Sequence, residues 1–286
     1  MTKAKIDTQA IGLDAGLGFI RWLTGAENLH YGLWTGLEVK AENLGAAQSA
    51  YSDKLFGYLP DGPLSILDVG GGAGETARKL IALGHSIEIV VPSALLAERC
   101  RQNAPEATVH EMPFEDFASD HTFDLCLFSE SFQYIPLDIA LDKALAHVKP
   151  GGHVLIADCF RSEDFAPDGK TRIAGGGHRI TAFRATLQAR GLQPQREEDI
   201  TTAVAPSIDI EQSLFHVFGD AISLIDAELS VKRPKARWLV SRFLGMLLGK
   251  RKLHRLNTRL RGNERTSAVF TLNNRYLITL LEKSGN

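Results

Sequence analysis

The chain of 286 residues has few cysteines and lacks the usual sequence features of secretion or membrane insertion. Its three cysteines, Cys100, Cys126 and Cys159, lie far apart and form no CxxC pair, which argues against a disulfide framework or a zinc cluster. The start MTKAKIDTQA has no apolar core of a signal peptide, and no apolar run reaches the roughly 18 to 20 residues that cross a bilayer. We therefore expect a cytoplasmic protein without a metal site.

Acidic residues are missing from the segment 232–261, which holds 11 Lys or Arg. The remainder of the chain has 21 basic and 34 acidic residues. Such local charge, with no aromatic platform interleaved, argues against nucleic acid as a partner. The apolar centre, 238–248, is too short to span a membrane but suits a helix in an anionic interface. Two interpretations stay open: a lid over the substrate, or peripheral attachment to the inner membrane face through 232–262.

From Ser65 onward, strand-like apolar runs alternate with helical patterns, joined by short Gly/Pro segments. This alternation predicts an α/β fold, a doubly wound and mostly parallel seven-stranded sheet with helices on both faces. We expect an N-terminal helical cap over 1–60 and a core of 61–203 and 264–286. A helical lid insertion, 204–263, interrupts the core before the last strand, RYLITLLEK.

A glycine loop, DVGGGAG, follows the first of these strands. Gly70, Gly72 and Gly74 allow a tight turn and the close approach of a ligand, because they carry no Cβ. A G-x-G-x-x-G dinucleotide loop would need glycine at Glu75, and no G-x-x-x-x-G-K-[ST] phosphate loop is present. The loop therefore indicates a ligand other than a dinucleotide or a nucleoside triphosphate.

The acid-x-G-x-G-x-G spacing, which begins at Asp68, resembles class I S-adenosylmethionine-dependent methyltransferases, and the resemblance extends over about 65–283. HEMPFEDF looks like the family's adenine loop, and FDLCLFSESFQYI looks like its fourth strand with the catalytic tip. LHYGLW is similar to an N-terminal motif of small-molecule and lipid methyltransferases, in which a helix caps the cofactor. The resemblance implies S-adenosylmethionine (SAM) as the cofactor.

Site residues follow from the same resemblance. The residues expected to contact SAM are Tyr31, Trp34, Asp68, Gly70, Gly72, Gly74, Val91, Ser93, Glu111, Met112 and Ser129. The candidate catalytic residues are Glu130, His30 and His178. Each has a structural alternative: Glu130 as a helix-capping acid, His30 in the packing of the cap, and His178 as a solvated loop histidine.

Val91 stands where the family usually places the Asp or Glu that binds both ribose hydroxyls. Hydrogen bonds to a charged acceptor contribute roughly 1.5–3 kcal/mol, so their loss would weaken SAM binding about 10- to 100-fold. Ser93 is placed to offer a single neutral hydrogen bond instead.

The predicted function is SAM-dependent methylation of a small, lipophilic metabolite at oxygen, nitrogen or carbon, within small-molecule biosynthesis. Two alternatives remain open because the ribose acid is missing. One is an enzyme of the same fold with non-methylating chemistry, such as cyclisation or decarboxylation, and the other is a non-catalytic partner protein. The substrate, the acceptor atom and the oligomeric state cannot be read from the sequence.

Overall fold

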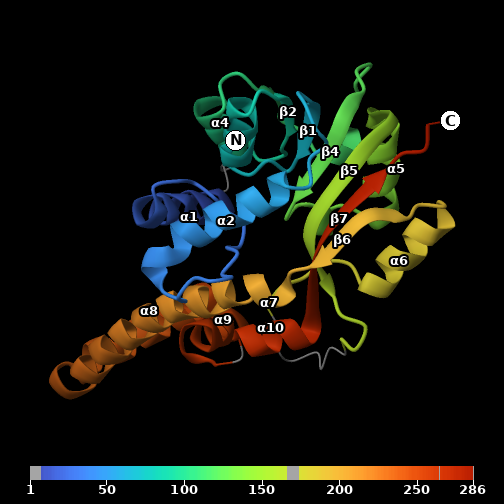
Figure 1. Ribbon diagram of the computed structural model, residues 1–286. Coiled ribbons are helices and arrows are strands. Elements are labelled where there is room, and N and C mark those ends of the chain that lie inside the picture. Colours follow the sequence, from blue (N-terminus) through green and yellow to red (C-terminus); the bar gives the residue numbers. More distant parts are fainter. Residues whose placement is uncertain (1–7, 166–173, 264, 286) are drawn as a thin grey trace.

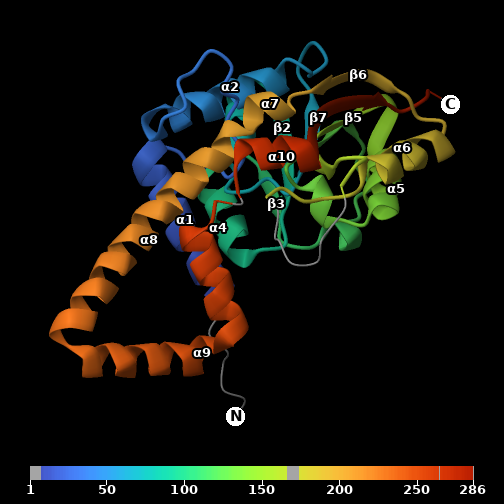
Figure 2. The ribbon, with the colours of Figure 1, turned by 90° about the horizontal axis from the view of Figure 1, so that it is seen from below.

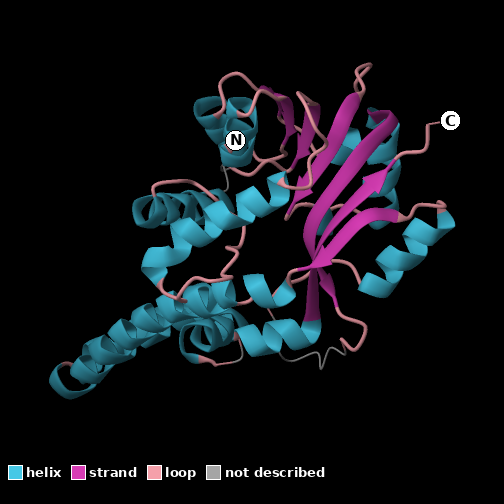
Figure 3. Ribbon diagram, viewed as in Figure 1, coloured by secondary structure: helices cyan, strands magenta, loops and turns pink. Residues whose placement is uncertain are grey.

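The computed structural model describes residues 8–165, 174–263 and 265–285. At its centre lies a seven-stranded sheet in the order β3-β2-β1-β4-β5-β7-β6 (Figure 3). β7 runs antiparallel to β5 and β6, and the other neighbours pair in parallel. The strands are β1 (Ser65–Val69), β2 (Ser86–Val90), β3 (Thr108–His110), β4 (Phe123–Ser129), β5 (Val148–Arg161), β6 (Pro194–Asp199) and β7 (Asn274–Glu282). The predicted doubly wound, mostly parallel sheet is confirmed, with RYLITLLEK as its inserted antiparallel strand.

Successive residues of the central strands enter two separate cores, one on each face of the sheet. Ile66 and Leu155 belong to the first core, and their neighbours Leu67 and Ile156 belong to the second. This two-residue period explains why these strands read as continuous apolar runs. The helices that follow the strands are α3 (Glu75–Ala82), α4 (Ala94–Asn103), α5 (Leu137–His147) and α6 (Ile180–Ala189), with the short 3-10 helices η2 (Phe114–Asp116) and η3 (Phe132–Tyr134). α3 and α4 contribute to the first core, and α5 and α6 to the second.

Helices precede the sheet, as predicted: α1 (Thr8–Thr24), the 3-10 helix η1 (Ala41–Asn43) and α2 (Leu44–Phe56). The LHYGLW motif, however, lies in an irregular segment between α1 and α2, and not on a helix. Gly32 explains this local structure, because a Cβ there would lie 2.6 Å from the Cβ of Ala47. The Leu33 N–H donates to the Ala47 carbonyl (2.8 Å), so the segment packs closely along α2.

Between β6 and β7 the chain forms α7 (Thr201–Val204), α8 (Pro206–Lys232), α9 (Pro234–Arg261) and α10 (Ser267–Asn273). We call α8 and α9 the helical arm (206–261), because they extend away from the sheet as a long excursion (Figures 1 and 2). α9 is kinked at Gly249, which has a φ of 68°. At the root of the arm, Gln212 Nε2 donates to the Arg259 carbonyl (3.0 Å) and joins the two helices.

The predicted domain boundaries and the lid role of 204–263 stay predictions, and residues 1–7 and 264 lie outside the described residues. None of the helices in the described ranges combines the length and the apolarity needed to cross a bilayer.

Candidate active site

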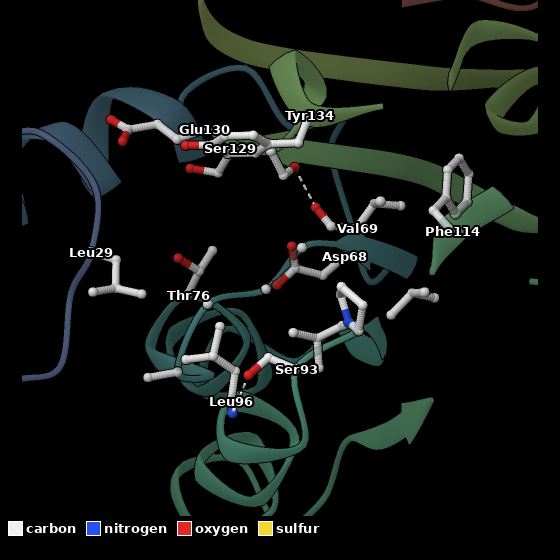
Figure 4. Close-up of a pocket in the computed structure, with 18 of the residues that line it drawn as sticks. Leu29, Asp68, Val69, Thr76, Ser93, Leu96, Phe114, Ser129, Glu130 and Tyr134 are labelled. Atoms are coloured by element: carbon white, nitrogen blue, oxygen red, sulfur yellow. Dashed lines mark hydrogen bonds between the residues drawn. The ribbon is translucent and has the colours of Figure 1, made fainter. Parts of the chain in front are cut away.

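A cavity of about 880 Å³ lies at the carboxyl ends of the parallel strands (Figure 4). Most residues that line it belong to the segments that follow β1, β2, β3 and β4, and residues 27–30 of the N-terminal region also line it. In α/β folds ligands bind at this edge of the sheet, because the loops after parallel strands converge there. The glycine loop, the motif His30 and the tip of β4 all meet in this one cavity.

The three glycines of the loop have positive φ angles of 76°, 56° and 87° at Gly70, Gly72 and Gly74. A Cβ on Gly70 would lie 2.4 Å from the Cβ of Ser131, and one on Gly74 would lie 2.9 Å from the Cα of Cys100. Gly70 and Gly74 are therefore required by packing within the protein. Gly72 differs, because a Cβ there would meet nothing closer than Leu29 Cδ1 at 3.8 Å. Because Gly72 has no side chain, a ligand in the cavity can approach the backbone at this position.

Three hydrogen-bond acceptors line the cavity without a partner among the described residues: Asn28 Oδ1, His30 Nε2 and Asp68 Oδ2. His30 Nδ1 donates to the Tyr31 carbonyl (2.8 Å), which leaves Nε2 as the acceptor of a neutral ring. Burial lowers the pKa of His30 to about 4 and raises the pKa of Asp68 to about 7. Buried polar atoms are normally hydrogen-bonded, so this set favours a ligand rich in donors, including a cationic group.

Glu130, at the end of β4, has a φ of 59°, in the left-handed region that is unfavourable for a side chain of this size. Its Oε1 accepts hydrogen bonds from the Tyr31 N–H (2.7 Å) and the Tyr276 hydroxyl (2.9 Å). The Tyr276 hydroxyl lies 2.7 Å from that of Tyr51. Burial, reinforced by the charge of Asp158, raises the pKa of Glu130 to about 8. The carboxylate is therefore held by the N-terminal segment and β7, while the residue lines the cavity.

The sequence profile of a methyltransferase domain matches residues 66–152, from β1 into β5. The 27-O-demethylrifamycin SV methyltransferase of Amycolatopsis mediterranei (strain S699) is 28% identical over 232 residues, which cover 72% of this chain and 81% of that protein. The dTDP-3-amino-3,6-dideoxy-alpha-D-glucopyranose N,N-dimethyltransferase of Streptomyces fradiae is 32% identical over 109 residues, 36% of this chain and 42% of that protein. This chain is a class I SAM-dependent methyltransferase.

Among solved structures, this chain is similar to the [4+2] cyclase SpnF, with a TM-score of 0.68 and 16% sequence identity. The match covers 97% of this chain and 96% of the SpnF chain. A likeness at such low identity establishes the fold alone. The methyltransferase domain and the two named methyltransferase relatives do not favour the alternatives of non-methylating chemistry or a non-catalytic partner protein.

The cavity of the methyltransferase fits SAM by its chemistry. Asn28, His30 and Asp68 offer unpartnered acceptors for the cofactor's ammonium and hydroxyl donors, and Gly72 leaves room beside the backbone. Phe114 lines the same cavity and would offer an apolar surface to the adenine ring. Bound there, SAM supplies an electrophilic methyl group on a sulfonium. The residues of the chain must hold it, orient the acceptor and exclude water.

Three other predicted contacts lie in the wall of the cavity: Val91, Ser93 and Ser129. Val91 is 1% exposed and also packs in the first core, and its side chain offers no hydrogen-bond acceptor to a ligand; its place beside the ribose stays a prediction. Ser93 caps α4, with its Oγ accepting from the Leu96 N–H (3.4 Å). Its hydroxyl proton stays available to a ligand, and the role of Ser93 as a neutral contact to the ribose stays a prediction.

Tyr31 and Trp34 are not among the residues that line the cavity. The Tyr31 ring packs edge-on against Phe270, and only its backbone N–H reaches Glu130. Trp34 is 3% exposed, and its indole N–H donates to the Ser207 hydroxyl at the start of α8 (2.9 Å). The structure thus places both side chains in the contact between the N-terminal segment and the last third of the chain.

Glu111, Met112 and His178 likewise lie outside the cavity wall. Glu111 is paired with Arg101 (3.2 Å), and Met112 packs against the second core. His178 Nε2 donates to the Ile135 carbonyl (2.9 Å), which favours a structural role in fastening the loop after β4.

Several site residues were missed by sequence reasoning. Phe114 lines the cavity and lies two residues beyond the predicted Met112, so a shift of register along HEMPFEDF would have found it. Tyr51 and Tyr276 are separated by 225 positions, so no local sequence pattern predicts that their hydroxyls are in contact. Asn28 directly precedes the motif LHYGLW, and nothing in the sequence indicates that its amide lines the cavity.

Proposed function

We propose that this methyltransferase transfers the methyl group to a hydroxyl oxygen of a small, lipophilic metabolite, and that Glu130 accepts the hydroxyl proton. The observation that carries the proposal is the position of Glu130: a buried carboxylate at the end of β4, oriented by two donors and lining the cavity. A general base must be held within reach of the proton that it removes.

The electrostatics of Glu130 support this role. Tyr31 N–H and the Tyr276 hydroxyl both bond to Oε1, so among the described residues Oε2 accepts no hydrogen bond and remains for a substrate proton. Its pKa of about 8 is closer to that of a weakly acidic hydroxyl than the usual value of a glutamate, which makes it a better base once ionised. The strained φ is consistent with a functional constraint.

The walls of the cavity support a lipophilic substrate. Leu29 and Tyr134 line the cavity while remaining 43% and 79% exposed, and Ile135 lies beside them in the wall. Apolar side chains exposed at the mouth of a cavity are typical of sites for apolar ligands. Oxygen as the acceptor is also supported by the rifamycin-type relative, whose name places the transferred methyl group on an oxygen.

A panel of lipophilic alcohols, phenols and amines incubated with SAM tests the proposal. S-adenosylhomocysteine formation and the methylated product are measured by mass spectrometry. We expect hydroxyl compounds to react, with a rate that rises with pH through about 8, because Glu130 must be deprotonated to act as the base.

Glu130→Gln should lower turnover about 100-fold, remove the rise with pH and leave the SAM dissociation constant nearly unchanged. Glu111→Gln, an acid outside the cavity wall, is the matched control and should retain activity. Methylation of amines alone, or a fully active Glu130→Gln, would contradict the proposal.

A further inference from the structure

The outer part of the helical arm exposes large apolar side chains. On α9, Trp238 and Leu239 are each 60% exposed, Phe243 is 56% exposed and Met246 is 79% exposed. No described residue of the arm lines the cavity, so these side chains are not explained by the active site. Their exposure in water is unfavourable, and several large apolar side chains exposed within three turns of one helix indicate an interaction surface.

These side chains surround the helix instead of forming one stripe. Successive residues of an α-helix project about 100° apart, and Trp238, Leu239 and Val240 are all exposed. A helix that docks into a protein groove shows apolar anchors along a single face. Apolar side chains around most of the circumference are instead expected where the first turns of α9 enter a lipid layer, which contacts a helix from several sides.

The charge of the arm points to the same kind of partner. Three of its acidic side chains form ion pairs with basic residues of the arm itself: Glu211 with Arg259, Asp226 with Arg237, and Glu228 with Lys232. With 11 basic residues and no acid between 232 and 261, the arm is strongly positive overall. Two arms packed together would bring like charges into contact, whereas an anionic lipid surface is complementary.

We propose that the helical arm docks on an anionic lipid bilayer, with Trp238, Phe243 and Met246 entering the interfacial region. Lys235 and Arg242 lie within the same turns and would meet lipid phosphates, and Arg242 already stacks over the Trp238 ring (5.4 Å). Tryptophan is favoured at the membrane interface because its ring is apolar and its N–H is polar. The arm extends away from the sheet (Figure 2), and none of its described residues lines the cavity.

Vesicle co-sedimentation of the full chain tests this inference independently of any methyl acceptor. The probes are vesicles of phosphatidylcholine with phosphatidylglycerol, beside vesicles of phosphatidylcholine alone. We expect binding to the anionic vesicles, weaker binding as salt is raised, and a blue shift of tryptophan fluorescence. The double substitution Trp238→Ser with Phe243→Ser should lower partitioning about tenfold or more.

A matched control removes two apolar side chains outside the arm that are at least as exposed, Leu83→Ser with Leu272→Ser, at 60% and 70%. It should bind vesicles as the parent does. Both double variants should keep the parent's circular dichroism and SAM affinity, which shows that they are folded. Failure of the parent to bind anionic vesicles would overturn the proposal. So would a concentration-dependent dimer that the Trp238 and Phe243 substitutions dissociate, because the arm would then bind a second copy.

Discussion

The cavity and the helical arm both present side chains that the protein itself does not satisfy, but of opposite kinds. In the cavity they are buried acceptors, such as Asn28 Oδ1 and Asp68 Oδ2. In the arm they are exposed apolar groups such as Trp238, set among basic residues. A buried acceptor demands a small donor-rich ligand, and an exposed apolar helix demands an extended apolar surface. The two regions are therefore expected to bind different partners and to be separable by mutation.

The largest effect that would test this separation is expected at Gly72. Gly72→Val would place a branched side chain in the cavity, and we expect SAM affinity to fall about 100-fold or more while vesicle binding by the arm persists. Titration calorimetry with SAM measures the first quantity.

Gly62→Val is the control, because Gly62 also has a positive φ (87°) and nothing within 4 Å of a built Cβ, but lies outside the cavity wall. Gly62→Val places the same side chain at a positive φ and should bind SAM as the parent does. Unchanged SAM affinity in folded Gly72→Val would remove Gly72 from the cofactor site.

A smaller effect is expected at Val91, where an acid would restore the family's ribose acceptor. Val91→Asp should tighten SAM binding about tenfold, since charge-assisted hydrogen bonds contribute roughly 1.5–3 kcal/mol but desolvating the new carboxylate offsets part of this. Because Val91 packs in the first core, the melting temperature should fall at the same time.

Val91→Asn separates charge from shape, because it is similar in size to Asp and uncharged. It should lose stability to a similar extent without the gain in affinity. A weaker or equal SAM dissociation constant for folded Val91→Asp would mean that other residues hold the ribose.

The part of the fold that follows from local sequence periodicity was predictable. β1 was expected at SILDV and spans Ser65–Val69, because its two-sided burial produces an unbroken apolar run. The glycine loop and Glu130 were likewise predictable, since both depend on the residues that directly follow a strand. The contacts that orient Glu130 were not, because Tyr31 and Tyr276 reach it across 99 and 146 positions of the chain.

The arm shows a second limit of sequence reasoning. The segment 232–262 was recognised as basic and apolar, but periodicity could not tell whether its apolar side chains pack on the domain or face outward. That depends on where the kink at Gly249 and the turn between α8 and α9 direct the helices. The motif LHYGLW raised a similar ambiguity, because its aromatic residues face the cavity or the arm depending on the path of an irregular segment.

The smallest expected effect concerns Trp34, which the sequence assigned to the cofactor and which the structure places against the root of the arm. Trp34→Phe keeps a ring but removes the indole N–H that donates to the Ser207 hydroxyl. A single neutral hydrogen bond contributes about 1 kcal/mol, and the lost ring volume adds to the cost, so the melting temperature should fall by a few degrees. Ser207 also accepts from the Gly32 N–H (3.0 Å), so Ser207→Ala alone should cost more. The double mutant, combined with both single variants in a thermodynamic cycle, isolates the Trp34–Ser207 interaction from these other losses.

SAM affinity should stay within about threefold of the parent in Trp34→Phe, because the ring does not line the cavity. A marked loss of SAM affinity with an unchanged melting temperature would instead assign Trp34 to the cofactor, and would show that the cavity and the arm share a residue.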